Sequence, residues 1–118
     1  MLSLLNVALA SYGDVLHQLK RYDESATCFA EALQIDRKIG GATGKLSAIT
    51  GYNRACSLAC GGRKDEAFAQ LDKSLDRDQS AGGEDLTREW VSEDGDLRTL
   101  RDDPRWAELV KRRFETGP

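Results

Sequence analysis

The stretch YDESATCFAEALQID (residues 22–36) returns in degenerate form as KDEAFAQLDKSLDRD (residues 64–78), 42 positions later. Both copies carry small and apolar residues at helical spacing and open on acidic residues, which favour the start of a helix. A fixed period of this length is typical of helical repeats that stack to bury a continuous core. Four pairs at this offset are identical: Asp23 and Asp65, Glu24 and Glu66, Leu33 and Leu75, Asp36 and Asp78.

Apolar periodicity and glycine punctuation predict four helices, at residues 3–19, 23–39, 43–60 and 65–79, which form two repeats (3–39 and 43–79). Glycine pairs at 40–41, 61–62 and 82–83 are expected to end the last three of these helices. Gly13 lies inside the first helix, where close approach of a partner helix explains a residue that lowers helix propensity. The expected buried stripe of this helix is Leu5, Leu9, Tyr12, Gly13, Leu16 and Leu19.

These two repeats resemble the tetratricopeptide repeat (TPR) family. The resemblance rests on small, aromatic and aliphatic residues in a fixed series, and it lacks the family's opening Trp and closing Pro. It implies an all-α, right-handed α–α superhelix. The first copy of the series is Tyr12, Gly13, Leu16, Tyr22, Ser25, Phe29 and Ala32, and the second is Arg54, Ala55, Leu58, Lys64, Ala67, Leu71 and Ser74.

The last third, residues 84–116, is predicted to be a capping element of short helices within one domain that spans residues 1–118. Asp103 and Pro104 are expected to open the final helix as an N-cap and a first-turn proline. The string DGDLRTLRDDPRWAEL (residues 94–109) is similar to a terminal element that follows the last repeat of many bacterial TPR proteins. The side chains expected to cover the apolar face of the last repeat are Trp90, Leu97, Leu100 and Trp106.

Composition narrows the classes of function. The 118 residues carry a net charge of -3, and the basic residues are spread along the chain, which argues against a nucleic-acid partner. No segment approaches the ~20 apolar residues of a membrane span. The start MLSLLNVALAS has no basic residue before Lys20, so it is not interpreted as a signal peptide. Three cysteines, an odd number, indicate free thiols and a cytoplasmic location.

Candidate chemistry is sparse. Cys28, Cys56, Cys60 and His17 could together form a Cys3His zinc site, but cysteine as a small residue between close helices is the favoured interpretation. The single histidine has no G-x-S-x-G nucleophile and no evident orienting partner, so no enzyme activity is predicted. Asp94 in SEDGDLRTL (residues 92–100) is interpreted as part of a solvated cap rather than of a calcium loop. We therefore expect no metal and no cofactor.

The remaining prediction is a binding surface. In TPR arrays the first helix of each pair lines a concave groove, and this groove is expected to bind a peptide or a partner helix. Tyr52 is its predicted anchor, because tyrosine is enriched at energetic hot spots. The alternative is a structural role, as the end of a longer array or a homo-oligomer formed through the N-terminal helix. The predicted groove residues are Asp14, His17, Arg21, Lys45, Ile49, Tyr52, Asn53 and Cys56.

Overall fold

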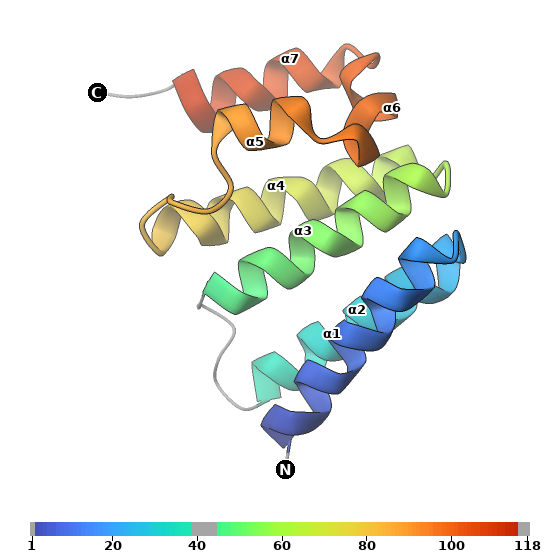
Figure 1. Cartoon of the computed structure of the whole chain (residues 1–118). Helices are drawn as coiled ribbons and strands as arrows, with labels where there is room; N and C mark the ends of the chain where they lie inside the picture. Colours follow the sequence, from blue (N-terminus) through green and yellow to red (C-terminus); the bar gives the residue numbers. More distant parts are fainter. Residues whose placement is uncertain (1, 39–44, 116–118) are drawn as a thin grey trace.

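The computed structural model describes residues 2–38 and 45–115. Two long antiparallel helix pairs come first, followed by a layer of short helices, and the three layers stack in chain order (Figure 1). No strand occurs in the described ranges. The elements are α1 (Leu2–Gln18), α2 (Tyr22–Lys38), α3 (Lys45–Cys60), α4 (Lys64–Ser80), α5 (Arg88–Glu93), the 3₁₀ turn η1 (Gly95–Leu97), α6 (Arg98–Arg101), α7 (Arg105–Val110) and the π-helical turn η2 (Lys111–Glu115).

The turns inside the two repeats have the same backbone geometry. Lys20 has φ 63° and its counterpart Gly62 has φ 82°, so both adopt the left-handed conformation that ends a helix. The N–H of Arg21 donates to the carbonyl of Leu16, and the N–H of Arg63 donates to that of Leu58, each at 2.9 Å. These bonds confirm the predicted helix ends at both turns. The glycine pair at 40–41 lies outside the described residues.

The close approach expected at Gly13 is confirmed. A methyl group there would lie 2.8 Å from Cε1 of Phe29, whose ring is fully buried. The hydroxyl of Ser25 donates to the carbonyl of Gly13 over 2.7 Å, which ties α2 to α1 directly. Repeat one therefore packs a large ring against bare backbone, because only glycine leaves room for it.

The buried face of α1 differs from the predicted stripe. Gly13 and Leu16 are buried, but Leu5, Tyr12 and Leu19 are exposed, and Asn6 is buried instead. The physical reason is a polar partner: the amide of Asn6 donates to the buried carboxylate of Asp36 over 2.8 Å. The helix carries apolar residues on two faces, and this hydrogen bond belongs to the face that meets α2.

The identical aspartates Asp36 and Asp78 each accept a hydrogen bond that joins one helix layer to the next. The hydroxyl of Ser47 on α3 donates to Asp36, and the backbone N–H of Leu86 donates to Asp78 over 3.0 Å. Both aspartates are buried near the ends of their helices. A residue conserved between the two repeats thus performs the same task at both junctions.

The short helices cover α3 and α4 as predicted, with one correction. Leu97 and Leu100 are fully buried, and Trp106 packs against the same core cluster. Trp90 was expected to join them but is 59% exposed, because its neighbour Val91 takes the inward position on the six-residue helix α5. The carboxylate of Asp103 accepts from the backbone N–H of Arg105 over 2.9 Å, but α7 begins at Arg105 with Pro104 as its N-cap, so the predicted helix start lies one residue too early.

Candidate functional site

The predicted groove narrows to a small hollow between α1, α3 and the turn at residues 94–97. Its volume is about 140 Å³. Four of the eight predicted groove residues line it, together with residues that were not predicted. The full lining is Asp14, His17, Gln18, Phe29, Asn53, Cys56 and Asp96.

The predicted anchor Tyr52 is not at the surface. Its side chain is 4% exposed, and its hydroxyl donates to the carboxylate of Asp94. Cys56, one turn further along α3, is buried as well, with its sulfur 3.9 Å from Oδ2 of Asp94. The prediction that Tyr52 faces an open groove is wrong, because the turn at residues 94–97 covers this face of α3. Cys56 lines the hollow but is buried.

The other predicted groove residues are scattered. Ile49 is exposed on α3, away from the hollow. Arg21 forms a two-pronged ion pair with Glu24, at 2.7 and 2.6 Å, one turn along the same exposed corner. The side chain of Lys45 lies outside the described residues. These three give no support to a continuous groove.

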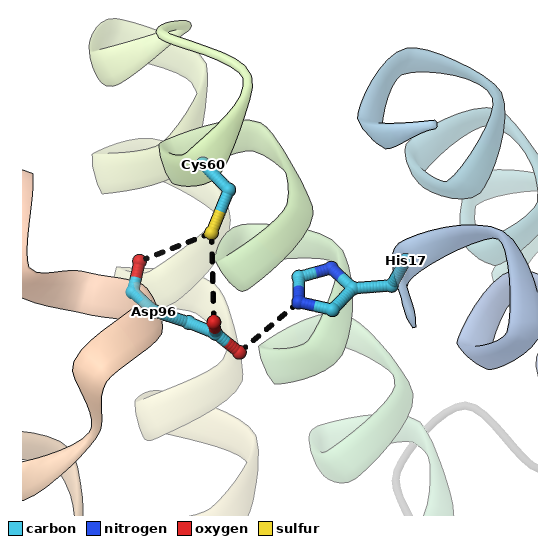
Figure 2. A group of neighbouring side chains, drawn as sticks. All are labelled: His17, Cys60 and Asp96. Carbon is cyan, nitrogen blue, oxygen red and sulfur yellow. Dashed lines mark hydrogen bonds and ion pairs between the residues drawn. The ribbon is translucent and has the colours of Figure 1, made fainter. Parts of the chain in front are cut away.

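At the mouth of the hollow, three side chains from three layers converge. In Figure 2 the side chains of Cys60 of α3 and His17 of α1 both reach the carboxylate of Asp96 of η1, Cys60 from above and His17 from the right. Nε2 of His17 lies 3.1 Å from Oδ2 of Asp96, and Sγ of Cys60 lies 3.6 Å from Oδ1 of the same carboxylate. All three side chains are partly buried. We call these three residues the His17–Cys60–Asp96 cluster.

A chain of hydroxyl groups holds the imidazole of His17. The hydroxyl of Ser25 donates its proton to the carbonyl of Gly13, so its oxygen accepts a hydrogen bond from the hydroxyl of Ser57, 2.9 Å away. The hydroxyl of Ser57 has then used its own proton, so it accepts from Nδ1 of His17 over 2.7 Å. The relay is fully satisfied when Nδ1 carries a proton, which leaves Nε2 directed at the cluster.

The thiols and the phenol of this region are held in their neutral forms. Burial, reinforced by the charge of Asp96, raises the pKa of Cys60 to about 12. Burial also raises the pKa of Cys56, with the carboxylates of Asp94 and Asp96 adding to it, and raises the pKa of Tyr52. A nucleophilic cysteine needs the opposite shift. The region therefore lacks the activated thiol of a cysteine hydrolase.

Sequence reasoning missed Ser57 and the role of Asp96. The prediction of a cap at Asp94 is confirmed, since its Oδ1 accepts from the N–H of Asp96 over 3.0 Å. The cap is not fully solvated, because the other oxygen of Asp94 accepts from the buried Tyr52. No local pattern indicates that this cap reaches His17, which lies 79 residues earlier. A second hollow of about 500 Å³, between α2, α3 and α4, was not predicted either. It is lined by Leu33, Arg37, Ser47, Gln70, Lys73, Asp76, Arg77 and Ser80.

Comparison with known proteins matches residues 3–80 to a family model described as a tetratricopeptide repeat. This match spans α1 to α4 and ends before the short helices. Neither the curated proteins nor the solved structures gave a significant match. Among the described helices, none combines the length and the apolar character needed to cross a lipid bilayer.

Proposed function

The chain belongs to the tetratricopeptide repeat family, and from that premise we propose that it is a protein-binding module that pairs along the exposed face of α1. Members of this family generally act as non-catalytic scaffolds for protein–protein interaction. The observation that carries the proposal is an unpartnered apolar seam on α1, and its proposed occupant is the same helix of a second copy of the chain.

The seam has the spacing of a helix-pairing surface. Leu5, Ala8, Tyr12, Val15 and Leu19 follow one another at intervals of three, four, three and four residues. This alternation is the apolar repeat with which two helices pack knobs into holes. All five side chains are exposed, so the face has no covering element within the described chain. Exposed apolar faces of this kind mark interaction sites on repeat proteins.

The near absence of charged residues on α1 allows the seam to pair with the same seam of a second copy. Asp14 is the only Asp, Glu, Lys or Arg between Leu2 and Gln18, and it does not belong to the seam. A two-fold pairing places each residue of the seam against the same surface of the partner. Such pairing of α1 with itself brings no like charges together, which supports a second copy as the occupant. The preceding repeat of a longer array would use the same face.

A peptide in the predicted groove is supported less well. The hollow of about 140 Å³ is smaller than the ~300–1,000 Å³ typical of ligand pockets. Its α3 wall is occupied by the turn at residues 94–97 through the bond between Tyr52 and Asp94. We further infer that the element predicted at residues 84–116 serves as an end-of-array cap. Three free thiols suit the cytoplasm rather than an oxidising compartment.

The test compares two valines on the same helix. Val15 lies in the seam and is 52% exposed, whereas Val7 lies outside it and is 51% exposed. Sedimentation equilibrium of the untagged chain over micromolar concentrations is expected to show a monomer–dimer equilibrium. Val15→Glu should weaken the dimer at least about tenfold, because it places one charge from each copy in an apolar interface. Val7→Glu should leave the equilibrium unchanged.

Two results would contradict the proposal. A strictly monomeric wild type would remove the second copy as the occupant of the seam. A dimer lost in Val7→Glu but kept in Val15→Glu would move the interface to the groove side of α1. Circular dichroism of both variants serves as the folding control, since neither valine is buried.

A further inference from the structure

We propose that the His17–Cys60–Asp96 cluster is a binding site for a divalent metal ion, with zinc as the preferred ion. The site would use Nε2 of the imidazole, Sγ of the thiol and one carboxylate oxygen, and a water molecule would complete a tetrahedral set. This proposal does not depend on the pairing of α1. It revises the expectation of no metal, which rests on Cys28, Cys56, Cys60 and His17; the proposed site keeps His17 and Cys60 and adds Asp96 in place of the other two.

The spacing of the three ligand atoms fits zinc. They all lie within 4.8 Å of one another. Zinc binds nitrogen and oxygen at ~2.0–2.1 Å and sulfur at ~2.3 Å, so a tetrahedral arrangement with one sulfur separates its ligand atoms by about 3.3–3.6 Å. Nε2 of His17 lies 3.1 Å from Oδ2 of Asp96, and Sγ of Cys60 lies 3.6 Å from the other oxygen of the same carboxylate, Oδ1. A rotation of the Asp96 carboxylate, together with closer approach of Nε2 and Sγ, would bring the three ligand atoms around one ion (Figure 2).

The hydrogen-bond relay prepares the imidazole for a metal. Ser57 and Ser25 require a proton on Nδ1 of His17, because their own protons are used further along the chain that ends at the carbonyl of Gly13. In the metal-free protein Nε2 pairs with Oδ2 of Asp96, so the ion would displace to solvent the proton that these two atoms share. The imidazole, with its remaining proton on Nδ1, would then present the lone pair of Nε2 to the ion. Metal-bound histidines almost always donate their other N–H in this way, which fixes the tautomer and the ring orientation. The ring is also held by edge-on contact with Tyr22, at 5.2 Å between centroids.

The chemical character of the ligands selects the ion. One imidazole, one thiolate and one carboxylate suit zinc or cobalt, whereas calcium and magnesium need a set of oxygens. Binding would release the thiol proton of Cys60 to solvent, and the carboxylates of Asp96 and the nearby Asp94 would balance the charge of the ion.

A bound ion would join three layers at one point. His17 belongs to the first helix pair, Cys60 to the second, and Asp96 to the capping element. The ion would therefore cross-link α1, α3 and η1 and stiffen the array where the layers meet. At a free zinc concentration ~100 times the Kd, binding restricted to the folded state multiplies the folding equilibrium constant about 100-fold.

The test uses untagged, reduced protein freed of metal, titrated with Co²⁺ and then with Zn²⁺. One Co²⁺ per chain is expected, with a thiolate-to-cobalt charge-transfer band and tetrahedral visible bands that Zn²⁺ abolishes. Cys60→Ser should remove the charge-transfer band, and Asp96→Asn and His17→Gln should each weaken binding at least about tenfold. Ser57→Ala should weaken binding ~10–100-fold while the spectrum keeps its shape, as expected for a group that orients a ligand.

Cys28→Ser is the matched thiol control, because Cys28 does not belong to the cluster; it should bind Co²⁺ as the wild type does. The absence of a saturable cobalt spectrum in the wild type would overturn the proposal. A spectrum lost in Cys28→Ser but kept in Cys60→Ser would overturn it as well. Asp96→Asn preserves the size of a partly exposed side chain, so unchanged binding in that folded variant would also refute the site.

Discussion

The contact between Gly13 and Phe29 decides the stability of the first repeat, and Gly13→Ala tests it. The new methyl group would lie 2.8 Å from Cε1 and 3.0 Å from Cδ1 and Cζ of a fully buried ring. Alanine favours a helix over glycine by about 1 kcal/mol. Overpacking of a dense core costs about 1–3 kcal/mol. The clash is therefore expected to win, with a net destabilisation of about 0–2 kcal/mol.

The second repeat shows how the clash can be relieved. At the positions equivalent to Gly13 and Phe29 it has Ala55 and Leu71, both fully buried in the same core cluster. The double variant Gly13→Ala/Phe29→Leu recreates that pair in the first repeat. Phe29→Leu by itself should cost less than the ~3–5 kcal/mol of a Phe→Ala truncation, because leucine retains most of the apolar volume. Added to it, Gly13→Ala should stabilise rather than destabilise.

The assay is a double-mutant cycle measured by urea unfolding and followed by circular dichroism. A coupling of about 1 kcal/mol or more between the two substitutions is expected, since contacting residues typically couple by ~0.5–3 kcal/mol. The reasoning would be refuted if Gly13→Ala stabilised the wild type by about 1 kcal/mol and the two effects were additive. That result would mean that the ring moves aside without cost and that glycine is not required there.

The two tryptophans and the alkaline limit provide further tests. Trp106→Ala should destabilise the fold by about 2–3 kcal/mol, below the range for fully buried aromatics, because its ring is partly buried. Trp90 is 59% exposed, so Trp90→Ala should cost under about 0.5 kcal/mol. Equal destabilisation of the two variants in thermal melts would contradict this packing. The folded state raises the pKa values of Cys60, Cys56 and Tyr52, so the unfolded chain loses protons first. Stability should be complete below about pH 9 and fall as pH rises toward about 12, in urea titrations at several pH values; a flat profile would count against buried neutral groups.

The helices were predictable because each has its own local signals. The 42-residue offset, the acidic first turns and the glycine at position 62 placed α1 to α4 within a few residues of their observed bounds. The face of α1 was not predictable in the same way. Its apolar residues form two stripes, and the choice between them depends on Asn6, whose amide meets Asp36 thirty residues later. Periodicity cannot reveal a polar contact of that range.

The prediction that Tyr52 anchors an open groove was wrong for a related reason. The sequence of α3 marks Tyr52 as a first-helix residue of a repeat, and in a bare array that position would face a groove. Whether it does depends on the turn at residues 94–97, which returns across α3 and binds the hydroxyl through Asp94. The same return brings Asp96 to His17 and Cys60, so one unpredicted loop path accounts for both the lost groove and the new cluster.

Asp36 and Asp78, which each join one helix layer to the next, would allow whole repeats to be added to the protein. Residues 37–78 begin just after Asp36 and end on Asp78, so they form one complete repeat unit of 42 residues. A second copy spliced in after Asp78 would present its own Ser47 to that carboxylate, as Ser47 now meets Asp36. The carboxylate at the end of the inserted copy would then receive the N–H of Leu86, as Asp78 does now. The sequence thus repeats the aspartate that joins neighbouring layers, and this repetition does not fix the number of repeats in the array.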